Sequence, residues 1–475
     1  MTAGRDSSAR RWRFAARTIG FVGLWTVALG PALASAQAEP VVLTLTDALS
    51  LAEGGNPALR RALNQADLNP TESRTLWFND LLPRANLTLF NTAFTGNLQR
   101  RAFDNFNNPI EDPTADWNYF SRTTHALQLT WEIQGPSLFQ SHRRQSLTNA
   151  DRELAYVEAR SSLDVEVQRL YLDALEQLQL LDFEEELIGA RETDLDVAQR
   201  LFQLAGRTRV DVLNAELEVE RQTLTRQQQS ASYERALLAL RTALGLEDDR
   251  AITVSEEPLP LFDPVDLDVT GLISRAIDGN ASVARSDLAV RSAALGVSEQ
   301  RANWWPAVSV GVDVFRRAYE PQTQALFDPS VGSDLEGQFS ISFSLPVLNN
   351  LFTQRLDQQR ASIELNNQRE TDRETRLELE ATIRGALLEL ENQWASYEIT
   401  ERAAVIAGEA VRLAREEYRL GSRTFEDLRS AFQQEADTRR TVITARHSFV
   451  DALLSLEEAV GAPIRPTTAS GVGGR

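Results

Sequence analysis

The stretch SLFQSHRRQSLTNADRELAYVEARSSLDVEVQRLYLDALEQLQLLDFEEELIGARETDLDVAQRLFQL, residues 137–204, decides the fold. It contains no proline and one glycine. Its apolar stripe advances in steps of four, three, four, four and three residues: Leu163, Val167, Leu170, Ala174, Leu178 and Leu181. These steps predict one helix with a tendency toward an 11-residue repeat, which favours nearly straight or right-handed pairing. At about 1.5 Å per residue the helix is roughly 100 Å long, so it does not fit inside a compact globule.

A second stretch, residues 350–420, repeats this pattern, with apolar positions at Leu377, Ile383, Leu387, Leu390, Trp394 and Tyr397. Each long stretch leads to a short break and another helix. The breaks align as GRTRVDVL (206–213) and GSRTFEDL (421–428), and the helices after them close with ALG and AVG. Upstream, GNPAL (55–59) corresponds to GNASV (279–283). Self-similarity on this scale predicts a tandem duplication.

The duplication divides the chain into five predicted segments. They are a signal peptide (1–38), a first repeat (39–247), a linker rich in Pro and Asp (248–267), a second repeat (268–461) and a disordered tail (462–475). The signal consists of an arginine-rich region, a short apolar core at residues 19–29 and small residues at 34–38. That core is too short for a transmembrane helix, which needs about 20 residues.

Four short stretches alternate apolar and polar side chains as strands do. They cover residues 85–89, 127–133, 308–314 and 339–345, and the segments 95–122 and 316–336 read as loops between them. Such alternation is typical of transmembrane barrel strands but also of a soluble sheet with one solvent-exposed face. The export signal and the long helices favour the barrel. Since about eight strands are the minimum for a closed barrel, several copies must share one, and three copies supply twelve strands.

Composition excludes several classes of protein. The formal net charge of -19 repels phosphates and argues against a nucleic-acid partner. The chain has no Cys, which excludes disulfides, thiolate metal sites and cysteine nucleophiles. Its three histidines, His125, His142 and His447, are too scattered for a metal site. No catalytic triad or phosphate loop can be assembled around them, so we expect neither an enzyme nor a cofactor.

Taken together, the duplicated Gly-Asn openings, the strand end FSLP (343–346) before a long helix and the turn LGSRT (420–424) resemble the TolC-like outer-membrane efflux protein family. The resemblance implies a mainly α fold with a transmembrane β-barrel portion. In it, a trimeric 12-strand barrel is continued by a periplasmic barrel of long antiparallel helices. It also implies an outer-membrane exit duct for an efflux pump or a type I secretion system. The partners would be outer-membrane lipid, a periplasmic adaptor and an inner-membrane pump or ABC transporter.

The same resemblance implies that the breaks at Gly206 and Gly421 are periplasmic tips, where the family closes its pore. Tyr418 and Arg423 match the gating tyrosine and arginine, Asp211 matches the aspartate of the neighbouring tip, and Glu426 matches one carboxylate of an acidic ring. The second ring position holds Arg429, with Asp427 nearby. An alternative role for Asp211, Glu426 and Asp427 is simple stabilisation of a helix's first turn.

One alternative to the channel stays open at this point. A soluble periplasmic coiled-coil adaptor or scaffold explains the signal and the helices, but it gives the alternating strands no purpose.

Overall fold

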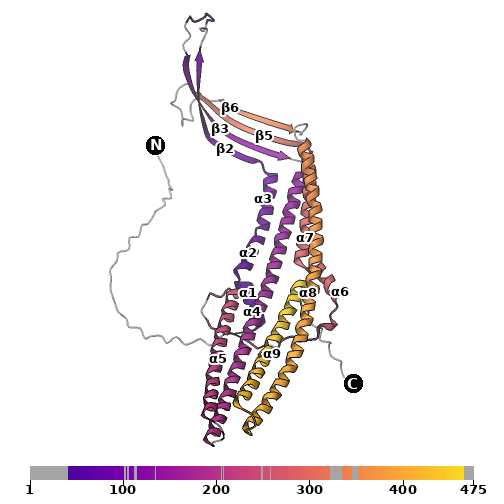
Figure 1. Ribbon diagram of the computed structural model, residues 1–475. Coiled ribbons are helices and arrows are strands. Elements are labelled where there is room, and N and C mark those ends of the chain that lie inside the picture. Colours follow the sequence, from indigo (N-terminus) through magenta and orange to yellow (C-terminus); the bar gives the residue numbers. More distant parts are fainter. Residues whose placement is uncertain are drawn as a thin grey trace, which may run out of the picture.

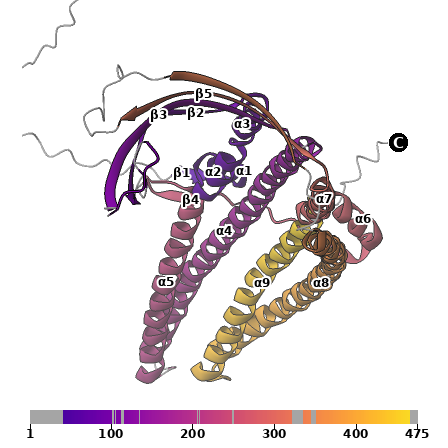
Figure 2. The same cartoon turned by 90° about the horizontal axis from the view of Figure 1, so that it is seen from above.

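Four long helices, as predicted, dominate the computed structural model, which describes residues 41–100, 103, 106–111, 115–133, 135–204, 206, 208–247, 250–256, 258–320, 334–344 and 351–464. Helices α4 (Ser137–Gln203) and α8 (Leu351–Arg419) are each roughly 100 Å long. Each turns back into a shorter helix, α5 (Arg209–Leu244) or α9 (Phe425–Val460). The two hairpins lie side by side in the order α5, α4, α9, α8, and their tips form one end of an elongated molecule (Figures 1 and 2).

The other end of the molecule is a single antiparallel sheet (Figure 1). Its strands are β2 (Arg84–Arg100), β3 (Ala115–Ile133), β5 (Ala307–Glu320) and β6 (Asp334–Ser344), in that order across the sheet. The pairing of β3 with β5 joins the two repeats.

The strands are longer than predicted. Arg100 pairs with Ala115 and Arg317 pairs with Asp334, so the ladder runs well into the segments 95–122 and 316–336 that were predicted as loops. Strict alternation of apolar and polar side chains stops in these outer parts, but backbone pairing continues, which explains the error. Leu345, predicted as the end of the last strand, lies outside the described residues.

Smaller elements pack around the middle of the long helices and along their halves next to the sheet. They are β1 (Val41–Leu43), α1 (Leu45–Gly55), α2 (Pro57–Ala66), α3 (Asn69–Leu81), β4 (Ile252–Val254), the 3-10 turn η1 (Pro264–Asp266), α6 (Val269–Gly279) and α7 (Ala281–Ala302). Strand β4 pairs in parallel with β1, so the predicted linker 248–267 returns to the start of the first repeat and is partly structured.

Two apolar cores occupy equivalent positions in the repeats. The first joins α1 to α4 and α5 around Ala48, Tyr171 and Leu240. The second joins α6 to α8 and α9 around Leu272 and Phe449. The order of elements in the two halves supports the predicted repeats, and their boundaries at 39–247 and 268–461 stay predictions. Ile464 is buried in the second core, so the fold extends into the predicted tail.

No helix among the described residues is long and apolar enough to cross a membrane.

Candidate functional site

The two tip turns differ in backbone geometry. In the first, between α4 and α5, the amide of Gly206 donates to the carbonyl of Leu201 at 2.8 Å. In the second, between α8 and α9, Gly421 adopts a positive φ of 79°, which a residue with a side chain rarely tolerates. Gly206 is absent from the described glycines with positive φ. A left-handed turn therefore requires glycine at Gly421 only.

Both predicted tip aspartates cap the returning helix. Asp211 accepts hydrogen bonds from the amide of Thr208 at 3.0 Å and from its hydroxyl at 2.9 Å. Asp427 accepts the same pair from Thr424, at 3.1 and 2.7 Å. The hydrogen bonds from Thr424 lower the pKa of Asp427. Each arrangement is a capping box, which stabilises the first turn of a helix.

Tyr418 lies inside the second tip. Its ring packs edge-on against Phe425, with 6.0 Å between the ring centroids. Both belong to an apolar tip core that also contains Val212 and Leu428. Residues of both tips therefore meet in this core, and the predicted gating tyrosine helps to hold them together.

The charged residues of the second tip form ion pairs within the protomer. Arg423 pairs with Glu417 on the last turn of α8. Arg429 donates to Glu426 at 3.0 Å and lies 3.7 Å from Glu218 of α5. The hydrogen bond from Arg429 lowers the pKa of Glu426. Arg429, which departs from the expected acidic ring, therefore connects the second tip to the first hairpin. The Arg423–Asp211 link stays a prediction for neighbouring copies.

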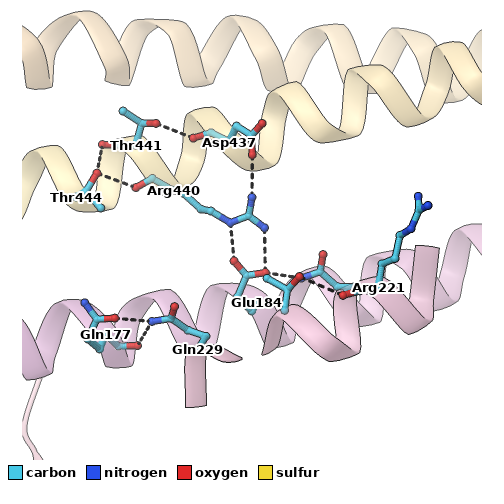
Figure 3. A network of polar contacts seen from close by, with 10 residues as sticks. Gln177, Glu184, Arg221, Gln229, Asp437, Arg440, Thr441 and Thr444 are labelled. Carbon is cyan, nitrogen blue, oxygen red and sulfur yellow. Dashed lines mark hydrogen bonds and ion pairs between the residues drawn. The ribbon is translucent and has the colours of Figure 1, made fainter. Parts of the chain in front are cut away.

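A buried carboxylate joins the two hairpins above the tips (Figure 3). Glu184 of α4 is 3% exposed and accepts hydrogen bonds from Arg440 of α9 at 2.6 and 3.0 Å. Gln222 of α5 donates to the same carboxylate, and Asp437 pairs with Arg440 at 2.9 Å. Three helices therefore share one carboxylate, which we call the hairpin lock, defined by Glu184, Gln222, Asp437 and Arg440.

A second buried acid lies closer to the tips. Asp194 of α4 is 3.3 Å from Arg415 of α8 and 4.0 Å from Arg191. Both guanidinium groups also lie over the ring of Phe432, at 5.0 and 4.2 Å from its centroid. Burial raises the pKa of Asp194 in spite of these cations. The hairpins are thus joined by charges as well as by apolar contacts.

Sequence reasoning missed Glu184 and Asp194, although a signal was present. Glu184 follows Leu181 by three residues, and steps of three, four and three then lead through Leu187 and Arg191 to Asp194. Both acids therefore continue the apolar stripe of the helix. A charge on such a stripe is buried unless the helix end is exposed, so it predicts a buried polar contact.

The three histidines lie on separate elements, β3, α4 and α9. Within the described part of the chain, no group of three or more His, Asp or Glu side chains is arranged to hold a metal ion.

Comparison with known proteins gives a family match for the second repeat and a similar fold for most of the chain. Residues 272–462 match the family described as Outer membrane efflux protein. No curated protein matches the sequence.

Solved structures resemble nearly the whole chain. A membrane protein from Pseudomonas aeruginosa shares 20% identity at a TM-score of 0.69, over 88% of this chain and 92% of that one. The CmeC outer membrane channel of Campylobacter jejuni shares 15% at 0.66, over 88% and 85%. The open state of the Neisseria gonorrhoeae MtrE outer membrane channel shares 17% at 0.65, over 88% and 89%. At these identities the likeness is one of fold.

Proposed function

We propose, from the premise that this chain belongs to the outer membrane efflux protein family, that it is the outer-membrane exit duct of a tripartite efflux pump. The family is one of channels, so the prediction that the chain is not an enzyme is confirmed. The observation that carries the proposal is the placement of a four-stranded sheet at one end of two helical hairpins, with β2 and β6 each paired on one side only among the described strands.

The side chains of the sheet suit lipid. On β6 the apolar residues Leu335, Phe339, Ile341 and Phe343 are between 64% and 75% exposed, while serines alternate with the last three. A protein surface in water rarely exposes such a row. A lipid environment stabilises this row of apolar side chains. An unpaired strand edge in lipid, however, costs several kcal/mol for each backbone N–H or C=O group without a hydrogen bond. Pairing of β6 with β2 of another copy removes both edges.

Three copies are the number we propose. Four strands in each of three protomers make twelve, above the minimum of about eight for a closed barrel. The hairpins then continue this barrel as a ring of helices in the periplasm. A periplasmic adaptor and an inner-membrane pump would engage the tips, and links between neighbouring tips would close the duct.

The native mass of the protein extracted from outer membranes in detergent tests this proposal. We expect a trimer that forms ion-conducting pores in planar bilayers. A soluble periplasmic monomer or dimer would refute the channel and favour the helical scaffold instead.

A further inference from the structure

A cleft of about 560 Å³ opens between α4, α8 and α9 at the level of the two apolar cores. Its charged lining comes from Arg169, Asp173 and Glu176 of α4, Glu389 of α8 and Asp451 of α9, together with His447 of α9. The volume lies in the range of small-ligand sites.

Charged residues of the cleft lie on another side of α4 and α9 than two central core residues. Tyr171 and Phe449 point into the cores formed with α1 and α6. Asp173, and likewise His447 and Asp451, are two residues away from these positions, which is about 200° around a helix. The charged lining therefore points away from these core residues, while the apolar lining residues Leu172, Ala386 and Ala452 belong to the second core or pack against it.

His447 presents an unused hydrogen-bond acceptor at this cleft. The residue is 4% exposed, and its Nε2 lies 3.0 Å from Oε1 of Gln179. Because an amide oxygen only accepts, Nε2 carries the proton and Nδ1 holds a lone pair. Nδ1 is buried and has no hydrogen-bond partner among the described residues. Burial and the nearby charge of Arg446 lower the pKa of His447 to about 4, so the ring is neutral at pH 7.

The cleft also carries excess negative charge. Its single guanidinium, that of Arg169, is already engaged by Asp451 at 3.1 Å and by Glu458 at 3.0 Å. Glutamines donate to Asp173 and Glu389 from their own helices. Within the described part of the chain, Glu176 has neither a hydrogen bond nor an ion pair. Burial, with Asp173 nearby, raises its pKa to about 7.

We propose that this cleft binds a protonated aliphatic polyamine, whose N–H groups satisfy the carboxylate of Glu176 and the Nδ1 lone pair of His447. An extended chain of ammonium groups matches a cleft that offers separated acceptors and a net negative charge, whereas an anion is repelled by it. The proposal adds a ligand class to the proposed duct, and the binding step is measurable whether or not the protein conducts.

The affinity depends on pH through Glu176. The groups that face it are Arg169 and Asp173 on its own helix, Glu389 on α8, and His447 and Asp451 on α9. Below pH 7 Glu176 is increasingly protonated and must lose its proton to pair with an ammonium group. Binding therefore tightens as pH rises from 6 to 8, while His447 stays neutral throughout.

Isothermal titration of the full-length protein in detergent with spermidine tests the site. At pH 8 we expect saturable binding that Glu176→Gln weakens about tenfold, the effect of one charge-assisted hydrogen bond. His447→Leu weakens it as well, since the Nδ1 acceptor is lost. Glu192→Gln is the matched control, because it removes the same charge from an exposed position of α4 that does not line the cleft.

Three results would overturn the site. They are the absence of saturable binding at pH 8, equal affinities for the Glu176→Gln and Glu192→Gln variants, and an affinity of the unaltered protein that does not fall between pH 8 and pH 6. Native mass, measured on the same samples, separates these results from a failure of the proposed assembly. A trimer that does not bind spermidine contradicts the site alone.

Discussion

At the scale of single residues, two asparagines explain why the openings of the two repeats look alike. Asn56 caps α2 by accepting from the amides of Ala58 and Leu59, while its side-chain NH2 donates to the carbonyl of Ala243 at 2.9 Å. Asn280 caps α7 and donates to Ala459 at 3.2 Å in the same way. Each asparagine thus ties the start of one helix to the end of a hairpin.

Glycines allow the first of these ties to be close. A Cβ on Gly55 would lie 2.4 Å from the carbonyl oxygen of Leu244. Gly245 has a φ of 69°, and a Cβ there would lie 2.3 Å from the carbonyl oxygen of Gly55. In the first repeat the Gly-Asn motif therefore marks a close backbone contact between the two ends of the repeat, whereas a Cβ on Gly279 of the second repeat would meet nothing within 4 Å.

Substitutions at Asn56 separate its two roles. We expect Asn56→Ala to lower the free energy of unfolding by about 2 kcal/mol, of which the cap and the tie each account for about half. Asn56→Asp keeps an acceptor for the cap but loses the donor, so its cost is smaller. Denaturant titration of the detergent-solubilised protein measures both, with the exposed Asn64→Ala of α2 as control. An alanine variant as stable as this control would show that the tie contributes nothing.

At the scale of elements, the sequence predicted the long helices almost to the residue. An uninterrupted apolar stripe is a strong signal, and capping boxes at Thr208 and Thr424 begin the returning helices α5 and α9. The strands were found but predicted too short, because their outer parts do not keep a strict alternation of apolar and polar side chains. The hairpin lock was not predicted, since its partners are more than 250 residues apart and nothing local pairs Glu184 with Arg440.

The hairpin lock is expected to stabilise the packing of the two hairpins. Glu184→Ala removes the acceptor shared by Arg440 and Gln222. Because Arg440 keeps Asp437 and its side chain is 31% exposed, we expect a loss of about 1–3 kcal/mol rather than the full cost of a buried unpaired charge. The matched control is Glu186→Ala, two residues further along α4. The ion pair of Glu186 with Arg439 is largely exposed and should contribute less than about 1 kcal/mol.

Thermal unfolding of the purified protein at equal concentration compares the two variants. If the unfolding temperature of Glu184→Ala equals that of Glu186→Ala, the buried hairpin lock contributes no more to stability than the exposed ion pair does.

At the scale of the whole molecule, the predicted gate depends on contacts between copies. Asp211 and Arg423 have partners within their own tips, so one protomer accounts for their positions without any role in closure. Sequence resemblance pointed to these residues, but their roles as a link require a neighbouring chain. That is why the sites were harder to predict than the fold.

We expect Asp211→Ala and Arg423→Ala to raise the conductance of the assembled duct in planar bilayers, because each removes one side of a charge-assisted link between tips. Asp211→Ala also removes a capping box, so Asp47→Ala, which breaks the same kind of cap in α1 far from the tips, is the control. Unchanged conductance in both tip variants would contradict the proposed link.

The difference between the two tip turns has a further consequence for the assembly. In the proposed trimer, three duplicated chains would present six hairpins, so the ring would have the outline of a hexagon but the symmetry of a triangle. Among the described residues, the left-handed tip glycine and the Arg429–Glu426 pair belong to the second hairpin, and Gly206 of the first tip does not have a positive φ. Neighbouring tips of the proposed ring would therefore differ in backbone geometry and charge, and a partner that contacts all six would meet two alternating surfaces.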